Sequence, residues 1–173
     1  ALGCLGVNNV LTVTPQGNRE WAKGLTDISG VPYGLSINFL SAKKSWEESL
    51  VMALDEARQR GFSQVLVLFG DVIPNVSLLG DALFSLPSNQ LLVPDYDGSG
   101  TQVMTVGENS MLMQYSAADQ RVQGGYEWMG WFMPVAFVDT LRNYSCIADC
   151  ISVIPNIWTV RLRKMPGYIN LNE

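Results

Sequence analysis

The feature that most constrains this fold is a capped amphipathic helix followed at once by an uninterrupted apolar strand. Ser45 and Glu48 have the Ser-x-x-Glu spacing of a capping box, and Gly61 is the helix stop. One stripe between them is apolar: Trp46, Leu50, Ala53, Leu54 and Ala57. The next segment, SQVLVLFGD at 63–71, has an apolar centre without polar alternation, which is typical of a strand covered on both faces. With a preceding strand at 31–40, this unit predicts a right-handed crossover, an α/β fold with a partly parallel sheet, and a central position for SQVLVLFGD.

Shorter patterns predict the remaining elements. Asn18, Glu20 and Gly30 carry the signals of a helix start and stop, and the aromatic residues Trp128, Trp131 and Phe132 are more typical of a core than of a sugar platform. Neither a repeat nor a linker interrupts the chain, so its 173 residues are expected to form a single domain, 1–173. Strands are expected at 7–15, 90–94, 103–107 and 110–116, the last two as a pair, and a helix at 75–86.

Composition excludes several function classes. The chain has no histidine, which removes Ser-His-Asp and Cys-His nucleophiles and imidazole proton shuttles, so acid and base chemistry falls to carboxylates, lysines or tyrosines. Apolar residues make up 47% and charged residues only 16%, so much of the chain must be buried. The net charge is −5 and no basic run is present, which argues against nucleic acid as a partner.

The cysteines and the first residues bear on the compartment. Cys4, Cys146 and Cys150 contain no CxxC pair, so neither a disulfide framework nor a zinc ribbon is expected, and the helical spacing of the last two is typical of packed small hydrophobes. The charge-free stretch 1–18 contains Asn, Gln and Pro and begins without a cation, unlike a signal peptide or a spanning helix. We expect no transmembrane segment and a cytoplasmic location.

Four segments, in order along the chain, resemble inverting nucleotide-sugar glycosyltransferases of the GT-A type, close to family 2. TPQGNRE at 14–20 is similar to the P-T-x-N-R loop that follows the first strand of that family, and residues 45–83 resemble its central helix and strand up to the acidic DXD motif. GGYEWMGWFMPVAFVDTLR at 124–142 looks like the acceptor-side strand and turn, and WTVRLRKMPGY at 158–168 is similar to a late helix of the family.

The resemblance implies a fold and a donor site. The fold would be one Rossmann-like GT-A domain with a mixed, mainly parallel central sheet flanked by helices, divided into a nucleotide-binding half, 1–100, and an acceptor half, 101–173. The ligand edge would lie at the carboxyl ends of the strands. Residues expected to bind the nucleotide-sugar are Thr14, Pro15, Asn18, Arg19 and Asp71.

The acidic motif departs from the family pattern. Its DXD falls on Phe69, Gly70 and Asp71, so only the last acid is retained. The resemblance implies that Asp71 holds a divalent metal, Mn²⁺ or Mg²⁺, against the donor diphosphate. A literal acid-x-acid stands at Asp95 and Asp97, and the metal role is either shared with that loop or displaced to it; turn capping is the structural alternative at both places.

The general base also departs from the pattern. The Glu-Asp pair that the family carries ahead of its Arg-rich helix is replaced by Ile154 and Pro155. Asp149 and Glu127 remain as equal candidates for a catalytic carboxylate that takes the acceptor proton, and the alternative that neither acts stays open. Asp139 is interpreted as a helix cap.

The resulting functional hypothesis is an enzyme, a metal-assisted glycosyltransferase moving a sugar from a nucleotide-sugar to a hydroxyl on a glycan, lipid or protein. A non-catalytic nucleotide- or sugar-binding module on the same fold is the main alternative, favoured by the lost acids. A nucleotidyltransferase shares the fold but needs a Gly-rich loop with a basic residue after its first strand, and TPQGNRE supplies one glycine. A flavodoxin-like protein would lack the antiparallel second half predicted from Val103 onward.

Overall fold

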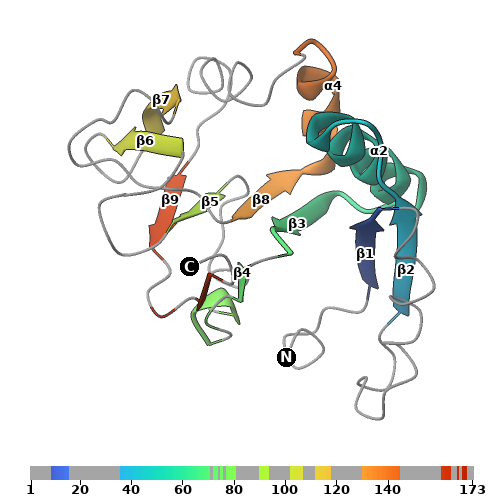
Figure 1. Cartoon of the computed structure of the whole chain (residues 1–173), viewed down its shortest axis with the longest axis horizontal. Coiled ribbons are helices and arrows are strands. Elements are labelled where there is room, and N and C mark those ends of the chain that lie inside the picture. The colour runs from blue at the N-terminus through green and yellow to red at the C-terminus, as the bar shows by residue number, and fades with distance from the viewer. Residues whose placement is uncertain are drawn as a thin grey trace.

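In the computed structural model, the described part of the chain consists of strands and one long helix (Figure 1). The residues described are 9–15, 36–70, 72–73, 75, 77–80, 90–93, 102–106, 112–117, 130–144, 161–164, 167 and 169–170. β1 (Asn9–Thr14) and β2 (Ser36–Ser41) form a parallel pair in which Asn9 lies opposite Ser36 and Thr14 opposite Ser41. Both strands were expected, whereas the helix expected between Asn18 and Gly30 lies outside the described residues.

Helix α2 (Trp46–Gln59) confirms the capped helix predicted from the sequence. The Ser45 hydroxyl accepts a hydrogen bond from the Glu48 backbone N–H at 3.1 Å, and the Glu48 carboxylate accepts one from the Lys44 backbone N–H at 3.2 Å. The reciprocal bond therefore falls one residue earlier than in an ideal capping box. Gly61 follows the helix with a φ of +83°, the left-handed conformation that favours glycine at a helix end.

Four strands form the largest sheet, in the order β3-β8-β5-β9. Pairing is antiparallel between β3 and β8 and between β8 and β5, and parallel between β5 and β9, so three of the four strands run in one direction. This arrangement is the mixed sheet expected of the fold class, and it unites strands from both halves of the sequence. Their bounds are β3 (Gln64–Leu68), β5 (Gln90–Val93), β8 (Gly130–Pro134) and β9 (Arg161–Lys164).

Two small sheets complete the described strands. β6 (Gln102–Val106) and β7 (Leu112–Ala117) form the antiparallel pair predicted from the sequence, with a register shift at Val106. β4 (Val72–Ile73) pairs antiparallel with β10 (Ile169–Asn170). Residues 77–80 are helical, and the Asn75 side chain accepts a hydrogen bond from the Leu78 N–H, so the helix expected from Asn75 begins as predicted.

The core lies over β8 rather than over β3. Trp131 and Met133 of β8 have no exposed surface, and the 3₁₀ turn η4 (Val135–Phe137) and helix α4 (Val138–Leu141) carry the chain from β8 under α2. The Trp131 and Phe137 rings pack with centroids 4.8 Å apart, which confirms that the aromatic residues Trp131 and Phe132 belong to the core. Trp128 lies outside the described residues.

The described residues place β3 at the end of the four-stranded sheet, so they do not show the central position expected of SQVLVLFGD. β3 pairs with β8 on one side, and within the described residues no strand pairs with its other side. Its apolar side chains are consequently half-buried, whereas those of β8 are buried because β8 has a strand on each side and helical segments above it. An apolar sequence favours burial of a strand, but the neighbouring elements determine how much of the strand is buried.

The segment near the C-terminus is also corrected. WTVRLRKMPGY was expected to contain a helix by resemblance, but Arg161–Lys164 is strand β9, paired in parallel with β5 from Arg161 opposite Gln90 to Lys164 opposite Val93. Leu162 alternates with charged residues at two-residue spacing, and that period suits a strand at the side of a sheet.

Charged groups join α2 to α4. The Arg58 guanidinium donates to both Asp139 carboxylate oxygens at 3.1 and 2.8 Å, and Arg142 lies beside the same carboxylate and is paired with Asp55. The sequence indicated that Asp139 caps a helix, and this prediction is wrong. Asp139 lies in the first turn of α4, and its carboxylate faces α2. The Arg58 guanidinium lowers the pKa of Asp139, and the Asp139 carboxylate raises the pKa of Arg58.

Candidate functional site

The ends of β1, β2 and β3 meet the start of α2 at one edge of the fold. β1 ends at Thr14 and β2 at Ser41, and the next backbone N–H, of Ala42, donates to the Thr14 carbonyl at 2.8 Å. The chain then enters α2 within a few residues. At the end of β3, the Phe69 ring lies 5.8 Å from the Trp46 ring in the first turn of α2, so this strand reaches the same edge. Carboxyl ends of strands are where open α/β sheets bind ligands.

Hydrogen bonds hold the connection from β2 to α2 in place. The Ser49 hydroxyl donates to the Ser45 carbonyl at 2.8 Å and accepts from the Lys43 N–H at 2.9 Å. Ser49 is buried, and its hydroxyl is used both as donor and as acceptor within this connection. The helix N-terminus is thus held in position, and Glu47 and Glu48 already supply the negative charge that its backbone N–H groups favour.

One buried polar group at this edge lacks a partner. The Thr14 hydroxyl oxygen is inaccessible to solvent and makes no hydrogen bond. Buried hydroxyls are normally bonded, because an unpaired one costs free energy. Thr14 is one of the residues that the sequence assigned to the nucleotide, and the structure gives it a position at the strand end with hydrogen-bonding capacity unused.

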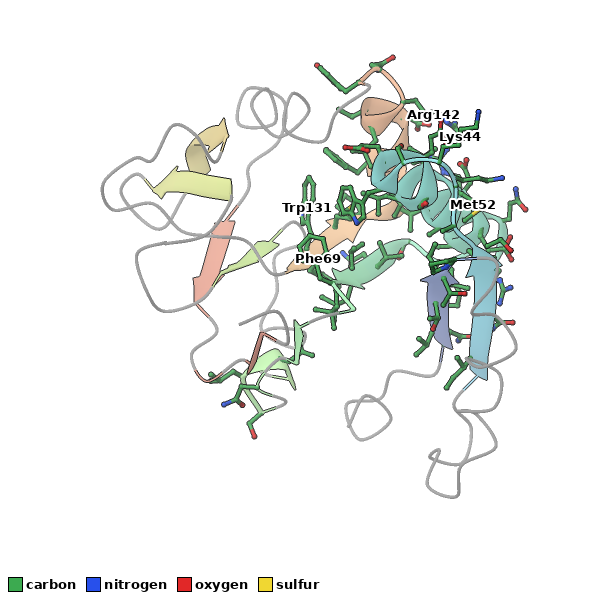
Figure 2. All side chains as sticks on the ribbon, viewed as in Figure 1. Lys44, Met52, Phe69, Trp131 and Arg142 are labelled. Carbon is green, nitrogen blue, oxygen red and sulfur yellow. The ribbon has the colours of Figure 1, made fainter. Side chains whose placement is uncertain are left out.

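The aromatic pair Trp46 and Phe69 was missed by sequence analysis. Trp46 was counted in the buried stripe of the helix, yet 36% of it is exposed, because the first turn of α2 extends past the sheet. Figure 2 shows Phe69 and Trp131 on one side of α2 and Lys44, Met52 and Arg142 on the other. The signal that could have found Trp46 is its place in the first helical turn directly after a strand end.

The remaining predicted site residues fall outside the described part of the chain. Thr14 lies at the edge with its side chain turned inward, and Pro15 follows it and is exposed. Gly70 is exposed at the end of β3, immediately before Asp71. The residues not described are Asn18, Arg19, Asp71, Asp95, Asp97, Glu127 and Asp149.

Metal binding is therefore untested at the predicted ligands. Within the described ranges, no three Cys, Asp or Glu side chains gather closely enough to hold a cation. Asp71, Asp95 and Asp97 are outside those ranges, so the divalent metal stays a prediction. In the same part of the chain, no helix has the length and apolar character needed to cross a bilayer.

An open groove of about 680 Å³ runs along α2 and α4, and it has a different character. Its lining mixes acids such as Glu47 and Asp55 with Lys43 and Arg142, and adds Met52 and Tyr144. Opposite charges of this kind are largely engaged with one another, as in the pair of Arg142 with Asp55. The strand-end edge, with its helix start and aromatic pair, remains the candidate site.

Comparison with known proteins gives the fold. No known family profile matches the chain, and no curated protein sequence matches it. Among solved structures, the inositol-1-phosphate CTP transferase of T. maritima superposes with a TM-score of 0.71 at 14% identity, over 95% of this chain and 69% of that one. A Bacillus anthracis protein assigned as a glucose-1-phosphate thymidylyltransferase, in complex with a sucrose, gives 0.78 at 11% identity, over 98% and 73%.

A third structure agrees with these two. The UDP-glucose pyrophosphorylase of Acinetobacter baumanii superposes with a TM-score of 0.72 at 13% identity, over 99% of this chain and 75% of that one. The chain therefore shares the mixed α/β fold of these three structures. The expected fold class is confirmed, and the names of these three structures describe nucleotidyltransferases or a pyrophosphorylase rather than family 2 glycosyltransferases.

Proposed function

We propose that the chain binds a nucleoside triphosphate at the strand-end edge and transfers its nucleotidyl group to a sugar phosphate. An oxygen of the sugar phosphate attacks the α-phosphorus of the triphosphate, the new P–O bond forms, and the bond to pyrophosphate breaks as pyrophosphate leaves. The products are a nucleotide-sugar and pyrophosphate. The observation that carries the proposal is a fold shared over 95% or more of the chain with three proteins whose names all describe reactions at sugar phosphates or nucleotide-sugars.

This reaction also suits a chain without histidine. A phosphate monoester has a second pKa of about 6, so the sugar phosphate is already a nucleophilic anion at pH 7 and needs no general base. Glycosyl transfer to a hydroxyl does need one, and its candidates Asp149 and Glu127 serve only that alternative. Nucleotidyl transfer therefore does not require Asp149 or Glu127 to act as a general base.

The edge offers features that suit a nucleotide. The exposed part of Trp46, backed by Phe69, is an aromatic surface on which a base can stack, a contact worth about 1–3 kcal/mol. Thr14 ends β1 at this edge, and Pro15, Asn18 and Arg19 follow it in the proposed nucleotide loop.

A divalent cation, Mn²⁺ or Mg²⁺, belongs to the proposal. When bound, it would neutralise charge on the phosphates as pyrophosphate leaves. Asp71 is its proposed ligand because it follows Gly70 at the end of β3, and Asp95 with Asp97 is the alternative or additional pair. Carboxylate oxygens are the ligands that both ions prefer.

A second candidate is the glycosyl transfer suggested by the sequence, with a nucleotide-sugar donor and a hydroxyl of a glycan, lipid or protein as acceptor. The observation that favours it is TPQGNRE, whose single glycine provides less backbone for wrapping a triphosphate than a Gly-rich loop does. In that case residues 1–100 would hold the donor and 101–173 the acceptor. The same missing glycines also fit a binding module without activity.

Product analysis distinguishes the three. The protein is incubated with Mg²⁺ or Mn²⁺, a panel of four nucleoside triphosphates, and glucose 1-phosphate or inositol 1-phosphate, and pyrophosphate is measured. Pyrophosphate released only when the sugar phosphate is present supports the proposal. In a separate incubation with nucleotide-sugars, release of nucleoside diphosphate supports glycosyl transfer instead. Ligand-induced stabilisation with neither product identifies a binding module, and a melting temperature unmoved by any nucleotide excludes the proposed site.

The site itself is tested with a matched pair of variants. Trp46→Ala is expected to weaken nucleotide binding about 10-fold, since one stacking contact is lost, and Trp46→Phe is expected to retain most of the affinity. Phe62→Ala is the control, because Phe62 is 37% exposed, almost as much as Trp46, but follows the other end of α2. Equal affinity in Trp46→Ala and Phe62→Ala would remove Trp46 from the site.

A further inference from the structure

The connection from β2 to α2, residues 42–45, is held at both of its ends. At its start, the Ala42 N–H donates to the Thr14 carbonyl at the end of β1 at 2.8 Å. At its end, the Ser45 hydroxyl accepts from the Glu48 N–H and caps α2. The backbone between these two points belongs to neither a sheet nor a helix, so its N–H groups need other acceptors.

Ser49 supplies one of these acceptors from inside the fold. Its hydroxyl accepts from the Lys43 N–H at 2.9 Å and donates to the Ser45 carbonyl at 2.8 Å, so one oxygen joins the connection at two residues. Ser49 is only 8% exposed, so water competes poorly for these bonds. Glu48 accepts from the Lys44 N–H at 3.2 Å on the exposed side, where water can take its place.

Trp46 follows this connection directly. It is the first residue of α2, and its ring lies 5.8 Å from the Phe69 ring at the end of β3. First turns of helices fray, because their N–H groups lack partners within the helix. A ring on a fraying turn is in place for only part of the time, and the apparent affinity of a ligand that needs it falls by that fraction.

We propose that Ser49 is a positioning residue of the strand-end edge: its hydroxyl fixes the backbone that leads into Trp46 and so holds the ring where a nucleotide base stacks. The choice of residue supports this role, because alanine is the better helix former and a buried serine suits a helix only where its hydroxyl has bonds to make. The inference rests on the proposed function, since the Trp46 ring contacts a base only if the edge binds a nucleotide.

A double-mutant cycle on nucleotide affinity tests the proposal. ATP, GTP, CTP and UTP are the probes, each with Mg²⁺, and the Kd is measured for the one that binds the parent most tightly. Ser49→Ala should weaken binding by about 3- to 10-fold, and by no more than Trp46→Ala does, because it leaves the Lys43 N–H without its acceptor and displaces the ring. In the Trp46→Ala background, Ser49→Ala should have no further effect. Additive losses, or an unchanged affinity in Ser49→Ala, overturn the proposal.

Matched variants separate this role from packing. Ser49→Thr keeps a hydroxyl that can bond the carbonyl four residues earlier, so it should retain more of the affinity than Ser49→Ala. Glu48→Ala removes the exposed bond to the same connection and should weaken binding less. If Ser49→Ala fails to fold, Ser49→Cys takes its place, because its thiol has a similar shape and bonds weakly. A loss in Glu48→Ala as large as that in Ser49→Ala overturns the role of the buried hydroxyl.

Fluorine NMR reports on Trp46 without a nucleotide. The protein is labelled with 5-fluorotryptophan, and the resonances of Trp46 and Trp131 are those absent from Trp46→Phe and Trp131→Phe. Ser49→Ala should shift or broaden the Trp46 resonance and leave that of Trp131 unchanged, because Trp131 is fully buried in the core at β8. An unmoved Trp46 resonance overturns the proposal whether or not nucleotides bind. A parent that binds none of the four triphosphates contradicts the proposed function, and the fluorine spectra then decide the positioning of Trp46 on their own.

Discussion

Two adjacent strands, β3 and β8, show how the same kind of sequence ends in different surroundings. β3 is QVLVL and β8 is GWFMP, and both are predominantly apolar. β8 has a strand on each side and carries the fully buried Trp131 and Met133, whereas β3 is paired on one side and its apolar side chains are half-buried. The difference shows that β8 belongs to the buried core, whereas β3 lies at the edge of its sheet within the described residues and is only half-buried.

The largest effect on stability is expected from a change in the buried core at β8. Trp131→Ala should destabilise the protein by about 3–5 kcal/mol, because it removes a fully buried ring packed on Phe137 and leaves a cavity. Leu66→Ala on β3 should cost less, about 1–2 kcal/mol, since its side chain is only half-buried. Denaturant unfolding of both variants measures the two values. Comparable losses would contradict the distinction between the two strands.

The turn from α2 into β3 should give the next largest effect. Gly61→Ala is expected to destabilise by about 1–2 kcal/mol, because its φ of +83° is strained for any side chain even though space is open around it. Gly70→Ala, at the other end of β3, is the matched control: it also has open space and no positive φ. Its unfolding free energy should match or exceed that of the parent. A loss at Gly70 equal to that at Gly61 would mean that backbone conformation is not the cause.

The sequence predicted local structure better than strand neighbours. Ser45, Glu48 and Gly61 determine α2 through interactions within a few residues, so the helix was predictable. The position of β3 was not, because it depends on β8, which lies more than sixty residues away in the sequence. The strand β9 was taken for a helix by resemblance, since four residues of alternating charge acquire their conformation from pairing with β5.

The candidate site was predictable only in outline. Pro15 and the end of β3 indicated the edge of the sheet that is now the candidate site, because strand ends follow from the local pattern. Trp46 was missed, since periodicity assigns it to the buried stripe and only the position of the helix start relative to the sheet exposes it. The fold relationship to nucleotidyltransferases depends on how all the strands are arranged and left no sequence signature strong enough to distinguish it from glycosyltransferases.

A smaller effect on stability is expected at the N-terminus of α2. Ser45→Ala should destabilise by about 1 kcal/mol, because the hydroxyl that accepts from the Glu48 N–H is lost. Ser45→Asp should retain most of the stability, since aspartate caps helices equally well and adds a favourable charge at the N-terminus. Thermal unfolding of the two variants is the measurement. If both lose stability to the same extent, the hydroxyl acts through something other than capping.

The smallest effect on stability is expected at the surface contact between the two helices, where Arg58 of α2 forms an ion pair with Asp139 of α4. The hydrogen bonds from Arg58 lower the pKa of Asp139 below its ordinary value of 3.8, so this carboxylate adds stability above that value and the contribution is lost as the pH falls through the lowered pKa. The side chains are 41% and 63% exposed, and salt screens such pairs, so the contribution is small. Asp139→Asn should therefore lower stability slightly at pH 7 and lose less of it than the parent between pH 5 and pH 2, in urea unfolding at low ionic strength. Arg58→Gln should reproduce part of that smaller loss, because Arg142 still lies beside Asp139, and the double variant should behave like Asp139→Asn. A parent and an Asp139→Asn variant with the same acid dependence would mean that the carboxylate titrates alike in the folded and unfolded chains, and that α2 and α4 are held together by burial of Leu54, Val138 and Leu141 without help from this pair.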